Sequence, residues 1–171
     1  GFVANPMERA EASKVALYGV ADYAWNMKAY NPESDFVEAC RYVLPEAPEA
    51  FRTFCENNCD PGPNGHRYRR DESVRNAGAF LNDFRQHNYN ADAADQINRL
   101  FAEIIAAPAA IGTSRNTALI DEIRPWLMQF HLLGKAGQAA IRTAEAGQGE
   151  DRVTTWQSYL SLTSLLDSMR M

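Results

Sequence analysis

The stretch that decides the fold is Asn5-Pro6-Met7-Glu8-Arg9-Ala10-Glu11-Ala12-Ser13-Lys14-Val15-Ala16-Leu17-Tyr18. It begins like a helix, because Asn5 is a favoured N-cap, Pro6 suits the first helical position and Glu8 completes a capping box. The sequence therefore predicts a helix over about residues 6–24. Its apolar residues are interrupted by few polar ones, and this predicts a helix that is buried on more than one side.

The residues before this helix are few. Only Gly1-Phe2-Val3-Ala4 precede the predicted cap, and there is no initiator methionine or signal peptide among them. Phe2-Val3 is typical of the end of a buried strand. We therefore expect the chain to be a piece of a longer protein.

The composition is that of a folded domain. Apolar residues make up 46% of the chain and charged residues 23%, which excludes general disorder. No apolar run approaches the roughly 18 residues that a membrane span needs, so no membrane partner is expected. The net charge of −5 argues against a nucleic-acid partner. The three cysteines are an odd number and do not suggest a disulfide framework.

Helix signals continue along the chain, and strand signals are nearly absent. Asn31 and Asn90 are predicted caps, Pro108 should begin a connector, and Pro125 should kink or break a long helix. The helix over 71–86 is expected to bury five apolar residues, Val74, Ala77, Phe80, Leu81 and Phe84. The further helices are predicted over residues 31–45, 46–58, 71–86, 90–107, 116–146 and 151–170. The fold class is thus all-α, an antiparallel bundle of about five helices preceded by one further helix.

Adjacent acidic residues are the first candidates for catalytic groups. They occur at Asp71-Glu72, Asp121-Glu122 and Glu150-Asp151. All three fit the first turns of helices or solvated faces, where carboxylates are common. No nucleophile elbow, phosphate loop or dinucleotide fingerprint is present. We therefore predict no catalytic residue in the bundle.

Other side chains allow binding roles, each with a structural alternative. Cys55, Cys59 and His66 could converge on a metal, but their spacing is typical of small apolar residues near a helix end, so no metal and no cofactor are expected. The arginines at 67, 69 and 70 could bind an acidic group or brace their loop through ion pairs. The histidines His87 and His131 are interpreted as structural.

The tryptophans Trp25, Trp126 and Trp156 are interpreted as core residues or interdomain anchors rather than as platforms for sugar rings.

Two segments together resemble a known family. Asn5 to Lys14, with Tyr23-Ala24-Trp25-Asn26, is one, and Gly62-Pro63-Asn64-Gly65-His66-Arg67-Tyr68-Arg69-Arg70-Asp71-Glu72-Ser73 is the other. Both resemble the junction and the following helical region of bacterial family 84 glycoside hydrolases. These are β-N-acetylglucosaminidases, of which some are called hyaluronidases and some act like O-GlcNAcases. Arg124-Pro125-Trp126 and Leu132-Leu133-Gly134 extend the resemblance along the chain.

The resemblance implies a domain order and a chemistry. In this family a catalytic (β/α)8 barrel precedes the helical bundle, and two adjacent aspartates on an earlier barrel strand assist attack by the substrate's own acetamido group. Residues 1–30 would be the last strand end and last helix of the barrel, and residues 31–171 the post-catalytic bundle. This chain contains no Asp-Asp pair. The resemblance therefore implies an inactive fragment whose parent removes β-linked N-acetylglucosamine.

One site residue follows from the resemblance. Asn5 matches the asparagine after the last barrel strand, which hydrogen-bonds hydroxyl groups of the bound N-acetylglucosamine. Asn5 is also a good helix cap and could have that role alone. The implied partners are the barrel and a glycan that contains N-acetylglucosamine, and the implied location of the parent is secreted, periplasmic or on the cell surface.

Three functions remain open on the sequence. The chain could be a non-catalytic domain that buttresses the barrel, an independent module that binds a protein or polysaccharide, or a glycosidase in itself. The first predicts an exposed apolar patch on the free chain, larger than a few hundred Å². Such a patch would also allow the isolated chain to form a homodimer. The third is disfavoured, because the acid pair is missing.

Overall fold

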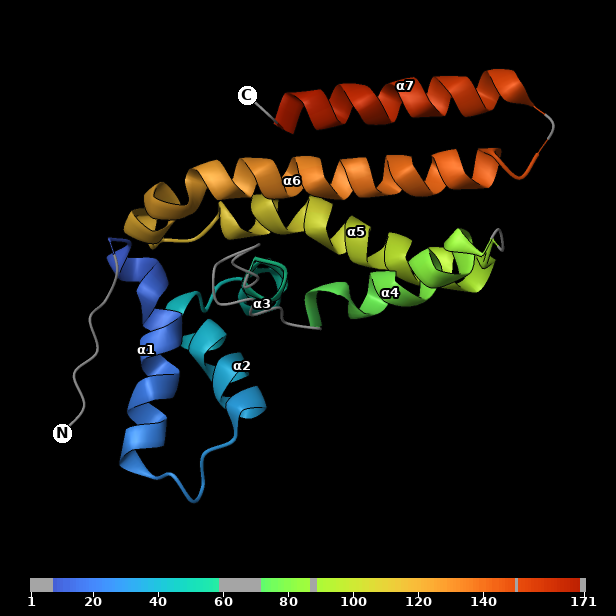
Figure 1. Cartoon of the computed structure of the whole chain (residues 1–171). Coiled ribbons are helices and arrows are strands. Elements are labelled where there is room, and N and C mark those ends of the chain that lie inside the picture. Colours follow the sequence, from blue (N-terminus) through green and yellow to red (C-terminus); the bar gives the residue numbers. More distant parts are fainter. Residues whose placement is uncertain (1–7, 59–71, 87–88, 150, 170–171) are drawn as a thin grey trace.

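Every element of the structure is a helix (Figure 1). The structure, a computed structural model, describes residues 8–58, 72–86, 89–149 and 151–169. The all-α prediction is confirmed in these residues. The helices are α1 (Ala10–Trp25), α2 (Pro32–Val43), α3 (Pro48–Glu56), α4 (Glu72–Arg85), α5 (Ala91–Ile111), α6 (Thr117–Ala146) and α7 (Arg152–Met169).

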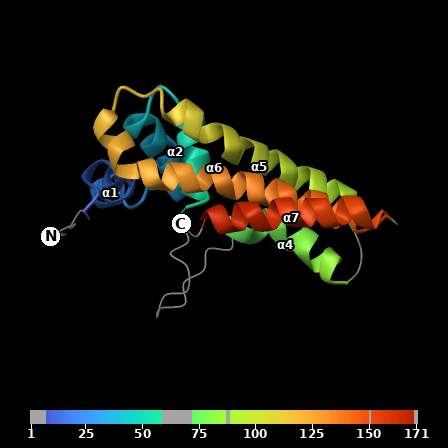
Figure 2. The same ribbon diagram turned by 90° about the horizontal axis from the view of Figure 1, so that it is seen from above.

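The long helices α5, α6 and α7 lie side by side and alternate in direction, with α6 between the other two (Figures 1 and 2). The hairpin of α1 and α2 lies at one end of this layer, where α1 contacts the beginning of α6. The short α3 joins α2 to α5, and α4 lies along α5. The arrangement is therefore an antiparallel bundle with a helical hairpin attached to one end.

Asparagines cap three of the helices, and two of them, Asn31 and Asn90, are caps that the sequence predicts. The side chain of Asn31 accepts hydrogen bonds from Glu33 N and Ser34 N at the start of α2. Asn90 accepts one from Ala93 N, and Asn116 one from Leu119 N. Each bond satisfies a backbone donor that the first turn of a helix leaves without a partner. Local sequence thus sets where these three helices start.

The main core lies where α2, α3, α5 and α6 meet. Phe54 stacks edge to face on Phe130, with ring centroids 5.2 Å apart. The buried members of this cluster are Cys40, Val43, Leu44, Phe51, Phe54, Ile104, Ala107, Ile111, Leu119, Ile123, Leu127 and Phe130. A second cluster joins α4, α5 and α6 through Phe80, Ala94, Ile97 and Ile141. Burial of the larger side chains, at about 1.5–3 kcal/mol for each Val, Leu, Ile or Phe, fixes the positions of α2 to α6.

The prediction for the first helix is wrong in its start and in its burial. Glu8 and Arg9 are not helical, and α1 begins at Ala10. Asn5, the predicted cap, lies outside the described residues. No residue of α1 is fully buried, since among the described helices its main neighbours are α2 and α6, and Trp25 at its end is 90% exposed. The helix therefore presents an uncovered side.

The prediction of a connector from Pro108 is also wrong. Helix α5 continues through Pro108 to Ile111, because Ala107 and Ile111 are both buried and hold the last turn on the core. Pro125 does not break α6. A proline leaves one carbonyl without its helical donor, and here that carbonyl belongs to Asp121 on the exposed side of the helix, where water can bond to it.

The burial predicted for α4 is half correct. Phe80 is buried, whereas Leu81 and Phe84 are 41% and 42% exposed. The reason is that the cluster formed with α5 and α6 includes Phe80 but neither Leu81 nor Phe84. The side chain of Val74 lies outside the described residues.

Candidate functional site at the junction of α1 and α6

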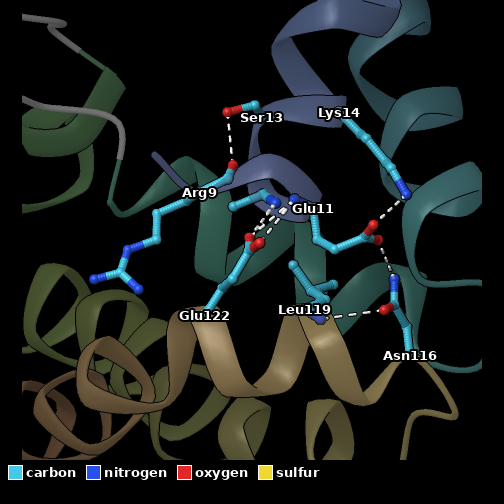
Figure 3. Close-up of polar contacts among 8 residues, drawn as sticks. Arg9, Glu11, Ser13, Lys14, Asn116, Leu119 and Glu122 are labelled. Atoms are coloured by element: carbon cyan, nitrogen blue, oxygen red, sulfur yellow. Dashed lines mark hydrogen bonds and ion pairs between the residues drawn. The ribbon is translucent and has the colours of Figure 1, made fainter. Parts of the chain in front are cut away.

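The first turn of α1 is held by a carboxylate from another helix. Glu122 on α6 accepts hydrogen bonds from Glu11 N, at 2.9 and 3.1 Å to its two oxygens, and from Ala12 N at 3.0 Å (Figure 3). No side chain of α1 itself caps these donors; the residue at the N-cap position is Arg9. A carboxylate at this place meets the positive end of the helix dipole. Glu122 therefore acts as an N-cap supplied by tertiary structure.

A second link joins the same turn to the start of α6. Asn116 Nδ2 donates to Glu11 Oε2 at 2.8 Å, while Asn116 Oδ1 caps α6 through Leu119 N (Figure 3). Lys14 forms an ion pair with the other oxygen of Glu11. The hydrogen bonds from Lys14 and then from Asn116 lower the pKa of Glu11. Asn116 thus connects the first turns of two helices.

The third link is a cation–π contact. The guanidinium of Arg9 lies over the ring of Trp126, 5.3 Å from its centroid. Such contacts contribute about 0.5–1 kcal/mol at exposed sites. Ser13 Oγ donates to the carbonyl oxygen of Arg9 at 2.7 Å and holds the backbone that leads into the helix (Figure 3). We call Asn116, Glu122 and Trp126 the α6 clamp.

The clamp lies on the part of α6 whose opposite face packs into the main core. Leu119, Ile123 and Leu127 are buried in the main core. They alternate with the clamp residues along the first three turns of α6. The clamp therefore holds the start of α1 against the bundle through contacts with both its backbone and its side chains.

The structure places the predicted site residues in different situations. Asn5, Cys59, His66, His87 and the arginines at 67, 69 and 70 lie outside the described residues. Cys40 and Cys55 lie on α2 and α3, and a contact with the Cys55 thiol lowers the pKa of Cys40. Within the described ranges no three His, Cys, Asp or Glu side chains are grouped as metal ligands. No described helix is both long enough and apolar enough to cross a membrane.

Two of the acidic pairs have roles that the sequence did not separate. Asp151 caps α7 by accepting from Val153 N and Thr154 N at 3.0 and 3.1 Å, as a first-turn carboxylate should. Asp121 pairs with Arg124 on the exposed surface. The sequence places the Asp121-Glu122 pair in a helix first turn or on a solvated face, but Glu122 instead reaches across to the backbone of α1. A contact over 111 positions has no local sequence signal.

The tryptophans are not core residues. Trp25, Trp126 and Trp156 are 90%, 46% and 60% exposed. The prediction of core positions is wrong, because helical spacing shows only which residues share a face and not whether another element covers that face. His131 has the structural contact expected of it, with its Nδ1 3.0 Å from the carbonyl oxygen of Ile105 on α5.

Known proteins share both parts of this chain. A family model described as the bacterial GH84 post-catalytic domain matches residues 72–169, and one described as beta-N-acetylglucosaminidase matches residues 1–56. The solved structure of CpGH84D matches with a TM-score of 0.89 and 28% identity, covering 97% of this chain and 28% of that one. CpGH84B matches with a TM-score of 0.90 and 22% identity, covering 99% and 30%.

The chain therefore spans less than a third of the length of the solved structures that it matches. The post-catalytic model covers more than half of the chain, and the fold agrees over nearly all of it. The resemblance noted in the sequence is confirmed. The chain belongs to the family of bacterial glycoside hydrolase family 84 post-catalytic domains.

Proposed function

We propose that this chain is the non-catalytic end of a β-N-acetylglucosaminidase and that it supports the catalytic barrel through α1. The observation that carries the proposal is the exposure of α1. This helix carries Val15, Leu17, Tyr18, Val20 and Ala21, yet no residue of it is fully buried. Helices with such a composition are covered on more than one side in folded proteins.

The end of α1 adds to this exposed surface. Tyr23, Trp25 and Met27 are 50%, 90% and 66% exposed, and Tyr42 on α2 is 71% exposed. Several large apolar side chains exposed on one helical hairpin favour a protein partner over open solvent. The match of residues 1–56 to a β-N-acetylglucosaminidase model supports a catalytic barrel as that partner. In the proposed parent, the barrel supplies hydrolysis of β-linked N-acetylglucosamine.

Asn5 is proposed to contact that sugar. Its amide can both donate to and accept from sugar hydroxyl groups. The proposal rests on its place before α1, which matches the asparagine after the last barrel strand in the family. The catalytic acids would come from the barrel, since this chain has no Asp-Asp pair.

We also propose that the domain boundary lies between residues 30 and 31. Support comes from the core, because α2 and α3 contribute Cys40, Val43, Leu44, Phe51 and Phe54 to one cluster with α5 and α6. From α1 only partly buried residues reach that cluster. A chain that starts at residue 31 should keep a single cooperative urea transition. Loss of that transition would place the boundary elsewhere.

The test uses the chain joined to its upstream coding sequence. That longer protein should hydrolyse 4-nitrophenyl N-acetyl-β-glucosaminide, and the 171-residue chain should not. Asn5→Ala should lower kcat/KM about two- to tenfold, the loss expected for one neutral hydrogen bond. A longer protein that folds but shows no glycosidase activity would overturn the proposed function.

Docking through α1 has its own matched control. Trp25→Ser should lower the melting temperature of the longer protein but leave the 171-residue chain unchanged. Trp156→Ser is the control, because this residue is also 60% exposed and belongs to α7, a different helix from α1 (Figure 1). Equal losses from the two variants would contradict docking through α1 in particular.

One observation favours a second function, a module that binds a protein or polysaccharide. Helix α7 has no fully buried residue, and among the described helices α6 is its main neighbour. Trp156 stacks on Tyr159 with ring centroids 5.5 Å apart, and Val153, Leu160 and Leu166 are also exposed. If Trp156→Ser abolishes binding of chitin oligosaccharides to the 171-residue chain, this function gains support.

We also propose that two isolated copies associate through the exposed apolar side chains at the end of α1. Sedimentation equilibrium of the 171-residue chain should show a dimer that Trp25→Ser dissociates. The same variant joined to the barrel should be a monomer, because the barrel would occupy that surface. A monomer at all concentrations would contradict the dimer.

A further inference from the structure

The side chain of Asp35 on α2 is buried against α1. It is 8% exposed, although aspartate is rarely buried unless it is paired. Its carboxyl group lies against Gly19: a Cβ added at Gly19 would be 2.9 Å from Asp35 Oδ2 and 3.6 Å from the hydroxyl oxygen of Tyr30. The missing side chain of Gly19 therefore leaves the space in which this carboxyl group is buried.

The partner of this carboxyl group is a second acid. Asp22 follows Gly19 by three positions on α1, and residues with this spacing share a face of the helix. A side-chain hydrogen bond joins Asp22 to Asp35. Ionised carboxyl groups have no proton to donate, so this bond forms only if one of the two acids is protonated. The contact between the helices therefore needs one proton.

No positive charge among the described residues takes the place of that proton. Burial and then the negative charge of Asp22 raise the pKa of Asp35. The other charged residues of α1, of α2, of the turn between them and of α3 do not contribute to this shift. They are Glu11, Lys14, Lys28, Glu33, Glu38, Arg41, Glu49, Arg52 and Glu56. The two acids therefore depend on each other.

We propose that Asp22 and Asp35 form a proton-dependent latch between α1 and α2. With the proton, one carboxyl group donates to the other and holds the two helices together (Figure 1). Without it, two negative charges repel each other at a site that is largely shielded from water. The exposed side chains of Tyr23 and Trp25 follow Asp22, so acid should hold this end of α1 more firmly on α2.

The first experiment measures the titration of the two acids in the 171-residue chain. NMR of the side-chain carboxyl carbons should give Asp35 a midpoint above 3.8, the ordinary value for aspartate. Asp22→Asn should lower that midpoint, because it removes the repulsion. Gly19→Ala should also lower it, because the added methyl group moves the carboxyl group toward water. Gly78→Ala is the matched control and should leave it unchanged, since no described atom lies within 4 Å of its added Cβ.

The second experiment measures amide hydrogen exchange at the end of α1, as protection factors corrected for the intrinsic effect of pH. Protection over residues 20–25 should be about two- to tenfold higher at about pH 4 than at about pH 7, the range expected for one hydrogen bond. Asp35→Asn should show the higher protection at both pH values, because its amide donates without a titrating proton. Asp121→Asn, at an exposed carboxylate on α6, is the control and should keep the pH dependence of the parent chain. Amides of the main core are the internal reference for global stability.

The latch is overturned if the midpoint of Asp35 lies at or below 3.8, or if Asp22→Asn does not lower it. It is also overturned if protection of α1 in Asp35→Asn depends on pH as it does in the parent chain. If Gly19→Ala does not fold, Asp22→Asn still decides the titration. Protection at neutral pH that rises with added CaCl2 as much as with acid would identify a cation site and would likewise overturn the shared proton.

Discussion

The ring of Phe101 on α5 lies in the space that a side chain at Gly137 on α6 would occupy. A Cβ at Gly137 would overlap three atoms of that ring. A Cβ at Gly134, about one turn earlier, would lie 2.7 Å from Ile105 Cγ1 and 3.0 Å from the carbonyl oxygen of Phe101. Two glycines on one face of α6 therefore set how closely the two longest helices approach.

Gly137→Ala should consequently destabilise the chain. Overpacking by one methyl group costs about 1–3 kcal/mol, because Phe101 has to leave its place. The measurement is the free energy of unfolding from urea titration. Gly78→Ala on α4 is the control, since no described atom lies within 4 Å of its added Cβ. That control should be neutral or gain up to about 1 kcal/mol from helix propensity.

Asn116→Ala should cost more than Asn31→Ala. Both asparagines cap a helix, and each cap contributes about 1 kcal/mol. Asn116 also donates to Glu11 at 2.8 Å, so its loss releases α1 from α6. Asn116→Asp should keep the cap but place a second carboxylate beside Glu11. If its unfolding free energy equals that of the parent chain, the bond to Glu11 contributes nothing.

Phe80 and Phe84 provide a test of the one-sided burial of α4. Their rings stack with centroids 5.9 Å apart, but Phe80 is 5% exposed and Phe84 is 42% exposed. Phe80→Ala should cost about 3–5 kcal/mol, as for a buried phenylalanine. Phe84→Ala should cost clearly less, because water already reaches its ring. Similar losses would mean that Phe84 is buried in solution.

Asp35 should make stability depend on pH. Its side chain is 8% exposed, and burial followed by repulsion from Asp22 raises its pKa above the ordinary value of 3.8. A raised folded-state pKa stabilises the fold below the unfolded value and loses that contribution as pH rises through the folded value. At neutral pH the ionised carboxylate is therefore unfavourable.

Asp35→Asn should accordingly be more stable than the parent chain at pH 7, and the gain should disappear below about pH 3.8, the unfolded value. Thermal unfolding at several pH values measures this difference. Asp22→Asn should give a smaller gain, because it removes the repulsion but not the burial of Asp35. A gain that grows at low pH would contradict the assignment.

Local sequence predicted much of this fold. The helices follow one another as their apolar spacing indicates, and Asn31, Asn90 and Asn116 cap the helices that follow them. These features depend on residues within one or two turns, where backbone donors find partners close in the chain. The family could be identified from sequence for the same reason, since its motifs lie in continuous segments.

Only the tertiary structure decided how α1 begins and what remains uncovered. The donors of Glu11 and Ala12 find their acceptor in Glu122, 111 and 110 positions away, and no spacing rule reaches so far. Helical spacing likewise indicates which face of a helix carries Trp25 or Trp156, but it does not indicate whether another element covers that face. Burial and long-range hydrogen bonds depend on which surfaces meet in space. The sequence by itself therefore determined the helices and their family, and their packing decided the clamp on α1.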